Sequence, residues 1–144
     1  MLIYLDNCCF NRPYDDQAHI AIRLESEAKL HVQEEILLGK YQLVWSYILD
    51  YENSQNPFLE RKSTIATWRR HAKLDIEAHP KVMDLARQYQ SMGLKAKDAL
   101  HLACARHAQC SVFLTTDKGI LRKADRIEGM SLQNPINFVA EEKE

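Results

Sequence analysis

The sequence has little glycine and proline, four residues of each among 144, and no internal repeat, low-complexity segment or Gly/Ser-rich linker. A chain of this length without a linker fits one domain, which we expect to span residues 1–144. No apolar run approaches the roughly 20 residues that cross a bilayer, which excludes a transmembrane helix. The segment Met1–Asp6 lacks the basic start and long apolar stretch of a signal peptide, so we expect a cytoplasmic protein without a membrane partner.

Paired cysteine motifs and an excess of basic charge are also missing. The four cysteines form no CxxC pair, and nothing else indicates secretion, so we expect reduced thiols. The formal net charge is −1, which excludes a polycation that coats nucleic acid nonspecifically. A local basic rim around an acidic site stays compatible with this balance.

What the sequence does contain is an alternation of short apolar runs and helical patterns. Strands are predicted at 1–5, 41–46, 111–116 and 130–132. Helices are predicted at 20–38, 46–55, 61–78, 80–92, 99–108 and 118–124. The segment 7–17 has the composition of a loop. Strands that alternate with helices predict an α/β domain with a mostly parallel sheet covered on both faces.

Four acidic residues fall at special places in this pattern. Asp6 and Asp117 each follow an apolar strand directly. Glu52 lies about two helical turns beyond the second strand, and Asp98 stands at the start of a helix that leads into the strand at 111–116. Ligands of open α/β sheets bind outside the carboxyl ends of the strands, so we expect the four acids to meet there.

Four carboxylates in one pocket repel one another unless protons or a cation neutralise them. Oxygen ligands suit Mg²⁺ and Mn²⁺. Such an ion acidifies water and stabilises charge on the oxygens of a phosphodiester. The four acids, if they assemble, therefore predict metal-assisted phosphodiester hydrolysis.

Each acid alone has a simpler interpretation. Asp98 suits a helix N-terminus, Asp117 before Lys118-Gly119 suits a turn, and Glu52 suits a solvated helix face. The order and spacing of the motifs around the acids are more specific than any single acid. These motifs are Ile3-Tyr4-Leu5-Asp6-Asn7, Ser46 with Glu52, Lys97-Asp98-Ala99-Leu100-His101-Leu102-Ala103, Leu114-Thr115-Thr116-Asp117 and Asn134-Pro135-Ile136-Asn137-Phe138.

On these motifs the whole chain resembles PIN-domain proteins, especially the VapC-like toxins of bacterial and archaeal toxin–antitoxin pairs. The resemblance implies a three-layer α/β/α domain with a short, mostly parallel central sheet. It also implies an endoribonuclease that depends on Mg²⁺ or Mn²⁺, acts on an RNA substrate, is restrained by an antitoxin protein and forms a homodimer.

The resemblance also assigns roles to the acids. It implies that Asp6, Glu52, Asp98 and Asp117 form the catalytic quartet. Asp6 and Asp98 are then direct metal ligands, and Asp117 binds the metal directly or through water. Glu52 holds a metal-bound water or acts as base, and Thr115 orients the site, with Asn7 adjacent.

One feature departs from the family pattern, and another leaves the identity of the second acid open. Many relatives have Asp-Thr-Asn after the first strand, where this chain has Asp6-Asn7-Cys8, so the polar contact beside Asp6 differs. Asp50 lies near Glu52 and is the alternative second acid.

Basic residues flank the predicted pocket, where they can contact phosphates of RNA. The candidates are Arg12, Lys95, Lys97, Lys118 and Arg122.

Other functions compete with this interpretation. His101, Cys104, His107 and Cys110 are zinc-binding residue types, but a spacing of three drifts around a helix and cannot present four ligands on one face. A haloacid-dehalogenase-like phosphatase needs a second Asp where Cys8 stands, and a receiver domain needs paired acids at the first strand. A noncatalytic RNA- or protein-binding module with the same fold stays open as the alternative.

Overall fold

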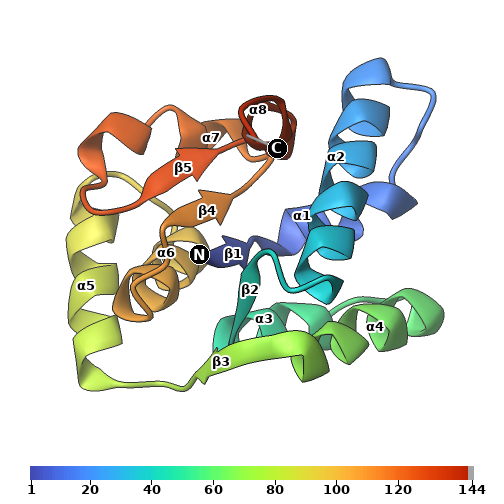
Figure 1. The fold of residues 1–144 in the computed structure, drawn as a ribbon. Helices are drawn as coiled ribbons and strands as arrows, with labels where there is room; N and C mark the ends of the chain where they lie inside the picture. The colour runs from blue at the N-terminus through green and yellow to red at the C-terminus, as the bar shows by residue number, and fades with distance from the viewer. Residues whose placement is uncertain (143–144) are drawn as a thin grey trace.

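The computed structural model describes residues 1–142, and a five-stranded parallel sheet lies at its centre. The strand order is β3-β2-β1-β4-β5, so the first strand is the middle one (Figure 1). In β1, Ile3 lies beside Leu43 of β2, and Tyr4 lies beside Phe113 of β4. Because all pairs are parallel, the carboxyl ends of the strands share one edge of the sheet.

The helices alternate with short strands along residues 1–142. The strands are β1 (Leu2–Leu5), β2 (Gln42–Ser46), β3 (Ala72–Ile76), β4 (Val112–Leu114) and β5 (Ser131–Gln133). The α-helices are α1 (Asn7–Asn11), α2 (Ile20–Leu37), α3 (Tyr47–Ser54), α4 (Leu59–Ala66), α5 (Pro80–Ser91), α6 (Ala96–His107), α7 (Lys118–Leu121) and α8 (Pro135–Ala140). Short 3₁₀ helices are η1 (Arg12–Tyr14), η2 (Thr67–His71) and η3 (Ala124–Arg126).

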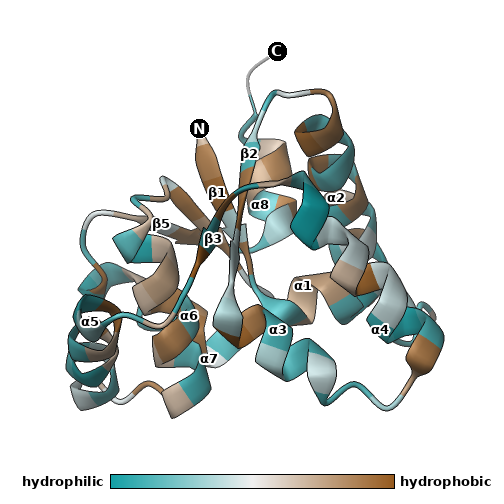
Figure 2. Ribbon diagram, turned by 90° about the horizontal axis from the view of Figure 1, so that it is seen from below, coloured by the Kyte–Doolittle hydropathy of each residue, from teal (hydrophilic) through white to brown (hydrophobic). Residues whose placement is uncertain are grey.

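Helices cover both faces of the sheet, which gives three layers. Figure 2 shows α5 and α6 on one side of the strands and α2 and α4 on the other. The side chains of Tyr4, Trp45 and Phe113 are fully buried between these layers. Strands buried on both faces have continuous apolar sequences, which is why β1, β2 and β4 could be predicted. Within the described residues, every helix is too short or too polar to cross a membrane.

The prediction of one helix over 61–78 is wrong. Helix α4 ends at Ala66, η2 follows, and the chain then enters β3, which pairs with β2 from Leu43 to Ser46. Strand β3 lies at the edge of the sheet, and its middle residues are exposed. An exposed edge strand needs no apolar run, because pairing with its neighbour satisfies its backbone groups. The strand is therefore stabilised by β2 and gives little signal of its own.

The predicted loop over 7–17 is wrong in its first half. The carboxylate of Asp6 accepts a hydrogen bond of 2.8 Å from the backbone N–H of Asn7 and so caps the short helix α1. Caps of this kind satisfy backbone N–H groups that have no partner inside the helix. The acid that ends β1 therefore also starts α1, and η1 continues the turn.

Candidate active site

A pocket of about 380 Å³ lies at the carboxyl ends of the central strands. Asp6, Glu52, Asp98 and Asp117 all line it, although they come from distant parts of the chain. Helices α1, α3 and α7, which follow β1, β2 and β4, lie close together at this edge in Figure 2. The structure thus brings the four predicted acids to one place. Asn7, Cys8, Asn11 and Asp15 complete the lining.

Asp6 is the most tightly held of these acids, with only 5% of its surface exposed. One carboxylate oxygen, Oδ1, accepts the hydrogen bond from the Asn7 backbone, and the other, Oδ2, accepts 2.8 Å from the Thr115 hydroxyl. The Cys8 thiol lies 3.4 Å from the same Oδ2. Hydrogen bonds of this kind fix the orientation of a carboxylate, so Asp6 faces the pocket in a defined position.

Thr115 links Asp6 to Asp117. Its hydroxyl oxygen donates to Asp6 and accepts a hydrogen bond of 3.0 Å from the backbone N–H of Asp117. The Asp117 carboxylate in turn caps α7 by accepting 3.1 Å from the backbone N–H of Ile120. One buried hydroxyl therefore orients the ends of β1 and β4 relative to each other.

Glu52 enters the pocket from α3 and is held by two side chains. Its Oε2 accepts 3.2 Å from the side-chain amide of Asn7, and its Oε1 accepts 2.5 Å from Nε2 of His101. Burial raises the pKa of Glu52, but the hydrogen bond and charge of His101, with the charge of Lys97, lower it below its ordinary value overall. Glu52 is consequently ionised at neutral pH.

Asp50, the alternative second acid, lies outside the lining of this pocket. Its Oδ1 accepts 2.8 Å from the indole N–H of Trp45, and its Oδ2 lies 3.6 Å from Arg69. These contacts attach α3 to β2 and η2, so Asp50 has a structural environment that differs from that of Glu52.

His101 contributes to the site through its hydrogen bond to Glu52, although in the sequence it stands out only as part of a motif and as a zinc-binding residue type. The ring is fully buried, and its Nδ1 lies 2.6 Å from the hydroxyl of Tyr4, which lies 2.6 Å from the hydroxyl of Ser46. Burial lowers the pKa of His101, but the hydrogen bond to Glu52 and the charges of nearby acids raise it overall. His101 lies three residues after Asp98, so both side chains lie on one face of the helix. This spacing is the sequence signal that could have indicated that His101 lies near the site.

Asp98 is partly buried in the pocket with acids among its charged neighbours. Burial, followed by the negative charges of Asp6 and Asp117, raises the pKa of Asp98 to about 6. A carboxylate whose neighbours are acids is destabilised in its charged form. The pocket therefore holds more negative charge than its own residues neutralise.

No group of three or more His, Cys, Asp or Glu side chains within residues 1–142 is already close enough together to hold a metal ion. This applies also to the zinc alternative at His101, Cys104, His107 and Cys110. The chemistry of the pocket nevertheless fits a hard divalent cation, because its charged donors are carboxylate oxygens, and burial together with the charges of neighbouring acids raises the pKa of Asp98. The residues that could hold such an ion are Asp6, Asp98 and Asp117.

The predicted basic residues differ in their surroundings. Arg12 is occupied, since its guanidinium pairs with Glu25 at 2.9 Å and with Asp15 at 3.0 Å. The side chains of Lys95, Lys97, Lys118 and Arg122 are exposed. The Lys97 ammonium lies 5.7 Å from the ring centroid of the exposed Tyr51. The exposed four are free to contact a phosphate backbone, whereas Arg12 is held by its acids.

Comparisons with known proteins agree with this architecture. The sequence profile of the PIN domain matches residues 3–126. None of the curated proteins matches the chain significantly. Among solved structures, VapBC2 from Rickettsia felis, bound to a promoter DNA fragment, has a similar chain at 15% identity and a TM-score of 0.57, over 93% of this chain and 98% of that one. VapBC-1 from nontypeable Haemophilus influenzae matches at 14% identity and a TM-score of 0.55, over 94% and 98%.

The profile match covers most of the chain, and the two solved structures share its fold at low sequence identity. The chain therefore belongs to the PIN domain family, whose members are generally nucleases.

Proposed function

We propose that this protein is a divalent-metal-dependent endoribonuclease, with Asp6, Glu52, Asp98 and Asp117 as its catalytic residues. One observation carries the proposal: four carboxylates line a single pocket, where burial, together with the charges of the other acids, raises the pKa of Asp98 to about 6. An arrangement that costs stability in the metal-free protein is understandable if a cation fills it. Mg²⁺ or Mn²⁺ suits carboxylate ligands best.

In this mechanism Asp6, Asp98 and Asp117 would hold the metal. A bound divalent cation lowers the pKa of water and stabilises negative charge on phosphodiester oxygens. Glu52 orients the attacking water through Oε1 or Oε2 and can accept its proton, because the residue is ionised and fixed by Asn7 and His101. Thr115 keeps Asp6 and the start of α7 in register.

RNA as the substrate and an antitoxin as a partner rest on the family. The structural relatives are chains of VapBC complexes, which supports a toxin restrained by an antitoxin. A homodimer stays a prediction from the same resemblance. The exposed Lys95, Lys97, Lys118 and Arg122 are the candidates for contact with RNA phosphates.

Cleavage of RNA with and without Mg²⁺ tests the proposal. Wild-type protein, Asp6→Asn and the control Asp84→Asn are incubated with a mixture of structured RNAs. Asp84 is exposed on α5, pairs with Arg87 one turn away at 2.8 Å and lies outside the lining of the acidic pocket, so its substitution leaves the pocket intact. We expect Mg²⁺-dependent cleavage by wild type and Asp84→Asn, and none by Asp6→Asn. Identical background cleavage by all three would favour the noncatalytic binding module instead.

A further inference from the structure

A second, smaller pocket lies between α2 and α4 and has no residue in common with the acidic pocket. Its volume is about 110 Å³. Aromatic and aliphatic side chains form most of its wall, and the polar residues in the lining are two from α2 and Thr64 from α4. The residues that matter here are Phe10, Tyr14, Ile65, Trp68, Lys29 and Gln33.

Lys29 is buried in this pocket without an acidic partner. Only 5% of its surface is exposed, and its ammonium lies 5.6 Å from the centroid of the Phe10 ring. No carboxylate among residues 1–142 pairs with it; Glu25, one turn earlier on α2, is occupied by Arg12. Burial lowers the pKa of Lys29 to about 8, so the ammonium is still charged at neutral pH. Lysine is almost never buried unless paired.

Gln33 supplies a second unused donor on the same helix face, four residues further along α2. Only 4% of its surface is exposed, and its side-chain nitrogen has no hydrogen-bond partner within the part of the chain that the structure describes. Most buried side-chain amides are hydrogen-bonded, so an unpaired amide nitrogen requires an explanation. The ammonium beside it contacts the Phe10 ring but no carboxylate among residues 1–142. Both groups are hydrogen-bond donors, and no acceptor among residues 1–142 is bonded to either of them.

We propose that Lys29 and Gln33 form a binding site for a carboxylate group. A carboxylate offers two acceptor oxygens, one for the ammonium and one for the amide, and its charge neutralises Lys29. The apolar walls suit the methylene groups behind a carboxylate, and the volume admits a side chain the size of Asp or Glu but no nucleotide. The site does not depend on the proposed nuclease activity, because it shares no residue with that pocket.

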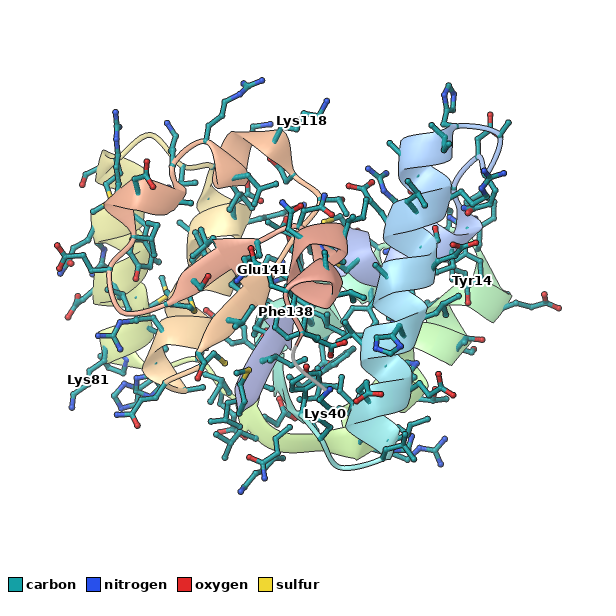
Figure 3. All side chains as sticks on the ribbon, turned by 45° about the horizontal axis from the view of Figure 1, so that its top comes forward. Tyr14, Lys40, Lys81, Lys118, Phe138 and Glu141 are labelled. Atoms are coloured by element: carbon teal, nitrogen blue, oxygen red, sulfur yellow. The ribbon has the colours of Figure 1, made fainter. Side chains whose placement is uncertain are left out.

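An acidic side chain of a protein partner is the source that the surroundings favour. Leu30, which lines the pocket, is 51% exposed, and Tyr14 is 40% exposed. A peptide that inserts its carboxylate would cover this apolar surface at the same time. Figure 3 shows Tyr14 beside α2, on the opposite side of the molecule from Lys81. Lys81 is exposed and lies outside the pocket, so it offers a matched control.

The test is a titration of the ¹⁵N-labelled full chain at pH 7 and constant ionic strength. Binding is followed by the backbone amide signals of the residues that line the pocket, which every variant retains, and in the chains that keep Gln33 also by its side-chain amide signals. The probes are sodium propionate, the blocked peptide Ac-Ala-Glu-Ala-NH₂ and inorganic phosphate. We expect saturable shifts with propionate or the peptide, and roughly tenfold or more weaker binding to Lys29→Met and Gln33→Leu, the effect of losing one good hydrogen bond to a charge. Binding to Lys81→Met should equal that of wild type.

The probes also identify the source of the carboxylate. Tighter binding of the peptide assigns the site to a partner's side chain, and tighter binding of propionate assigns it to a free organic acid. The proposal would be overturned by any of three results. These are no shifts with either propionate or the peptide, shifts in Lys29→Met equal to those in wild type, and stronger binding of phosphate than of the two carboxylates. In case the variants fold poorly, the pKa of Lys29 in the wild-type chain is measured with and without saturating ligand; a carboxylate in the site must raise it, and an unchanged pKa contradicts the site.

Discussion

Two acids of this molecule, Glu25 and Asp98, are both shielded from water at least in part but have opposite surroundings. Glu25 is 7% exposed and accepts 2.9 Å from Nε of Arg12 and 2.5 Å from the side-chain amide of Asn134. It thereby ties α2 to η1 and to the start of α8. Asp98 has no such donors among the described residues, and the acids around it help to raise its pKa to about 6.

The contrast separates an acid that stabilises the fold from one that costs stability. A buried carboxylate such as Glu25, which accepts hydrogen bonds from one charged and one neutral donor, is stabilised in its charged form. A carboxylate repelled by its neighbours is destabilising until a cation arrives. We therefore assign Glu25 to the fold and Asp98 to binding, and this difference can be tested in four ways.

The largest expected effect is the loss of catalysis that the substitution Asp98→Asn causes. The substitution removes a proposed metal ligand while keeping the shape of the side chain, so RNA cleavage should fall on the order of 10³-fold. Initial rates with saturating Mg²⁺ measure it. Glu25→Gln is the matched variant and should retain cleavage within about threefold at a temperature where it is folded. Equal losses in both variants would remove the distinction between the two acids.

His101→Gln should lower cleavage roughly 10- to 100-fold, the usual effect of removing a residue that orients a catalytic group. Without His101, Glu52 loses the interaction that lowers its pKa, so the acid limb of the rate–pH profile should move to higher pH. A purely structural histidine would change stability and leave that limb in place. Asp50→Asn is the control on the same helix as Glu52, and we expect its profile to match wild type.

Glu25→Gln should destabilise the fold by about 1–3 kcal/mol, because Arg12 loses its shielded acid and the amide introduced at position 25 replaces one of two acceptor oxygens with a donor. Arg12 is partly solvated and keeps Asp15, so the loss stays below that of a fully buried pair. Urea unfolding measures it. Glu27→Gln, exposed on the same helix, should change stability by less than about 0.5 kcal/mol. The assignment of Glu25 to the fold fails if the two variants are alike.

The smallest expected effect is the pH dependence of stability that Asp98 contributes. Its pKa in the folded protein is about 6 and its ordinary value is 3.8, so the folded state binds the additional proton between these values. The contribution to stability is complete below pH 3.8 and is lost as the pH rises through 6. Without metal, Asp98→Asn should be more stable than wild type at pH 7 by on the order of 1 kcal/mol, with the difference shrinking toward about pH 4. Urea unfolding of both proteins across this range measures the difference, and an Asn variant less stable at pH 7 would contradict repulsion at Asp98.

The sequence predicts most strands of the sheet and the position of the four acids at its carboxyl edge, because both depend on local signals. Apolar runs identify β1, β2 and β4. An acid that follows the last residue of a strand lies at the carboxyl edge of a parallel sheet, whatever the positions of the helices. The edge strand β3 was missed, because its exposed residues carry no apolar run and it depends on β2 for its partners.

The contacts between distant side chains could not be read from the sequence. The sequence favours Glu52 over Asp50 only through its distance from Ser46 and its place before Asn56-Pro57. The two acids lie two residues apart on one helix, and packing fixes the rotation of α3 that brings Glu52 into the pocket. The pairing of Arg12 with Glu25 likewise joins two segments through the tertiary fold. His101 was visible in the sequence, but its bond to Glu52 was not.

The central claim is that the four acids form a site for a divalent cation, and calorimetric titration with Mn²⁺ tests it most directly. At pH 7, wild-type protein should bind Mn²⁺ saturably, and Asp98→Asn should bind it at least roughly tenfold more weakly, while Glu25→Gln binds as wild type does. Mn²⁺ that binds no more tightly to wild type than to Asp98→Asn would contradict the account.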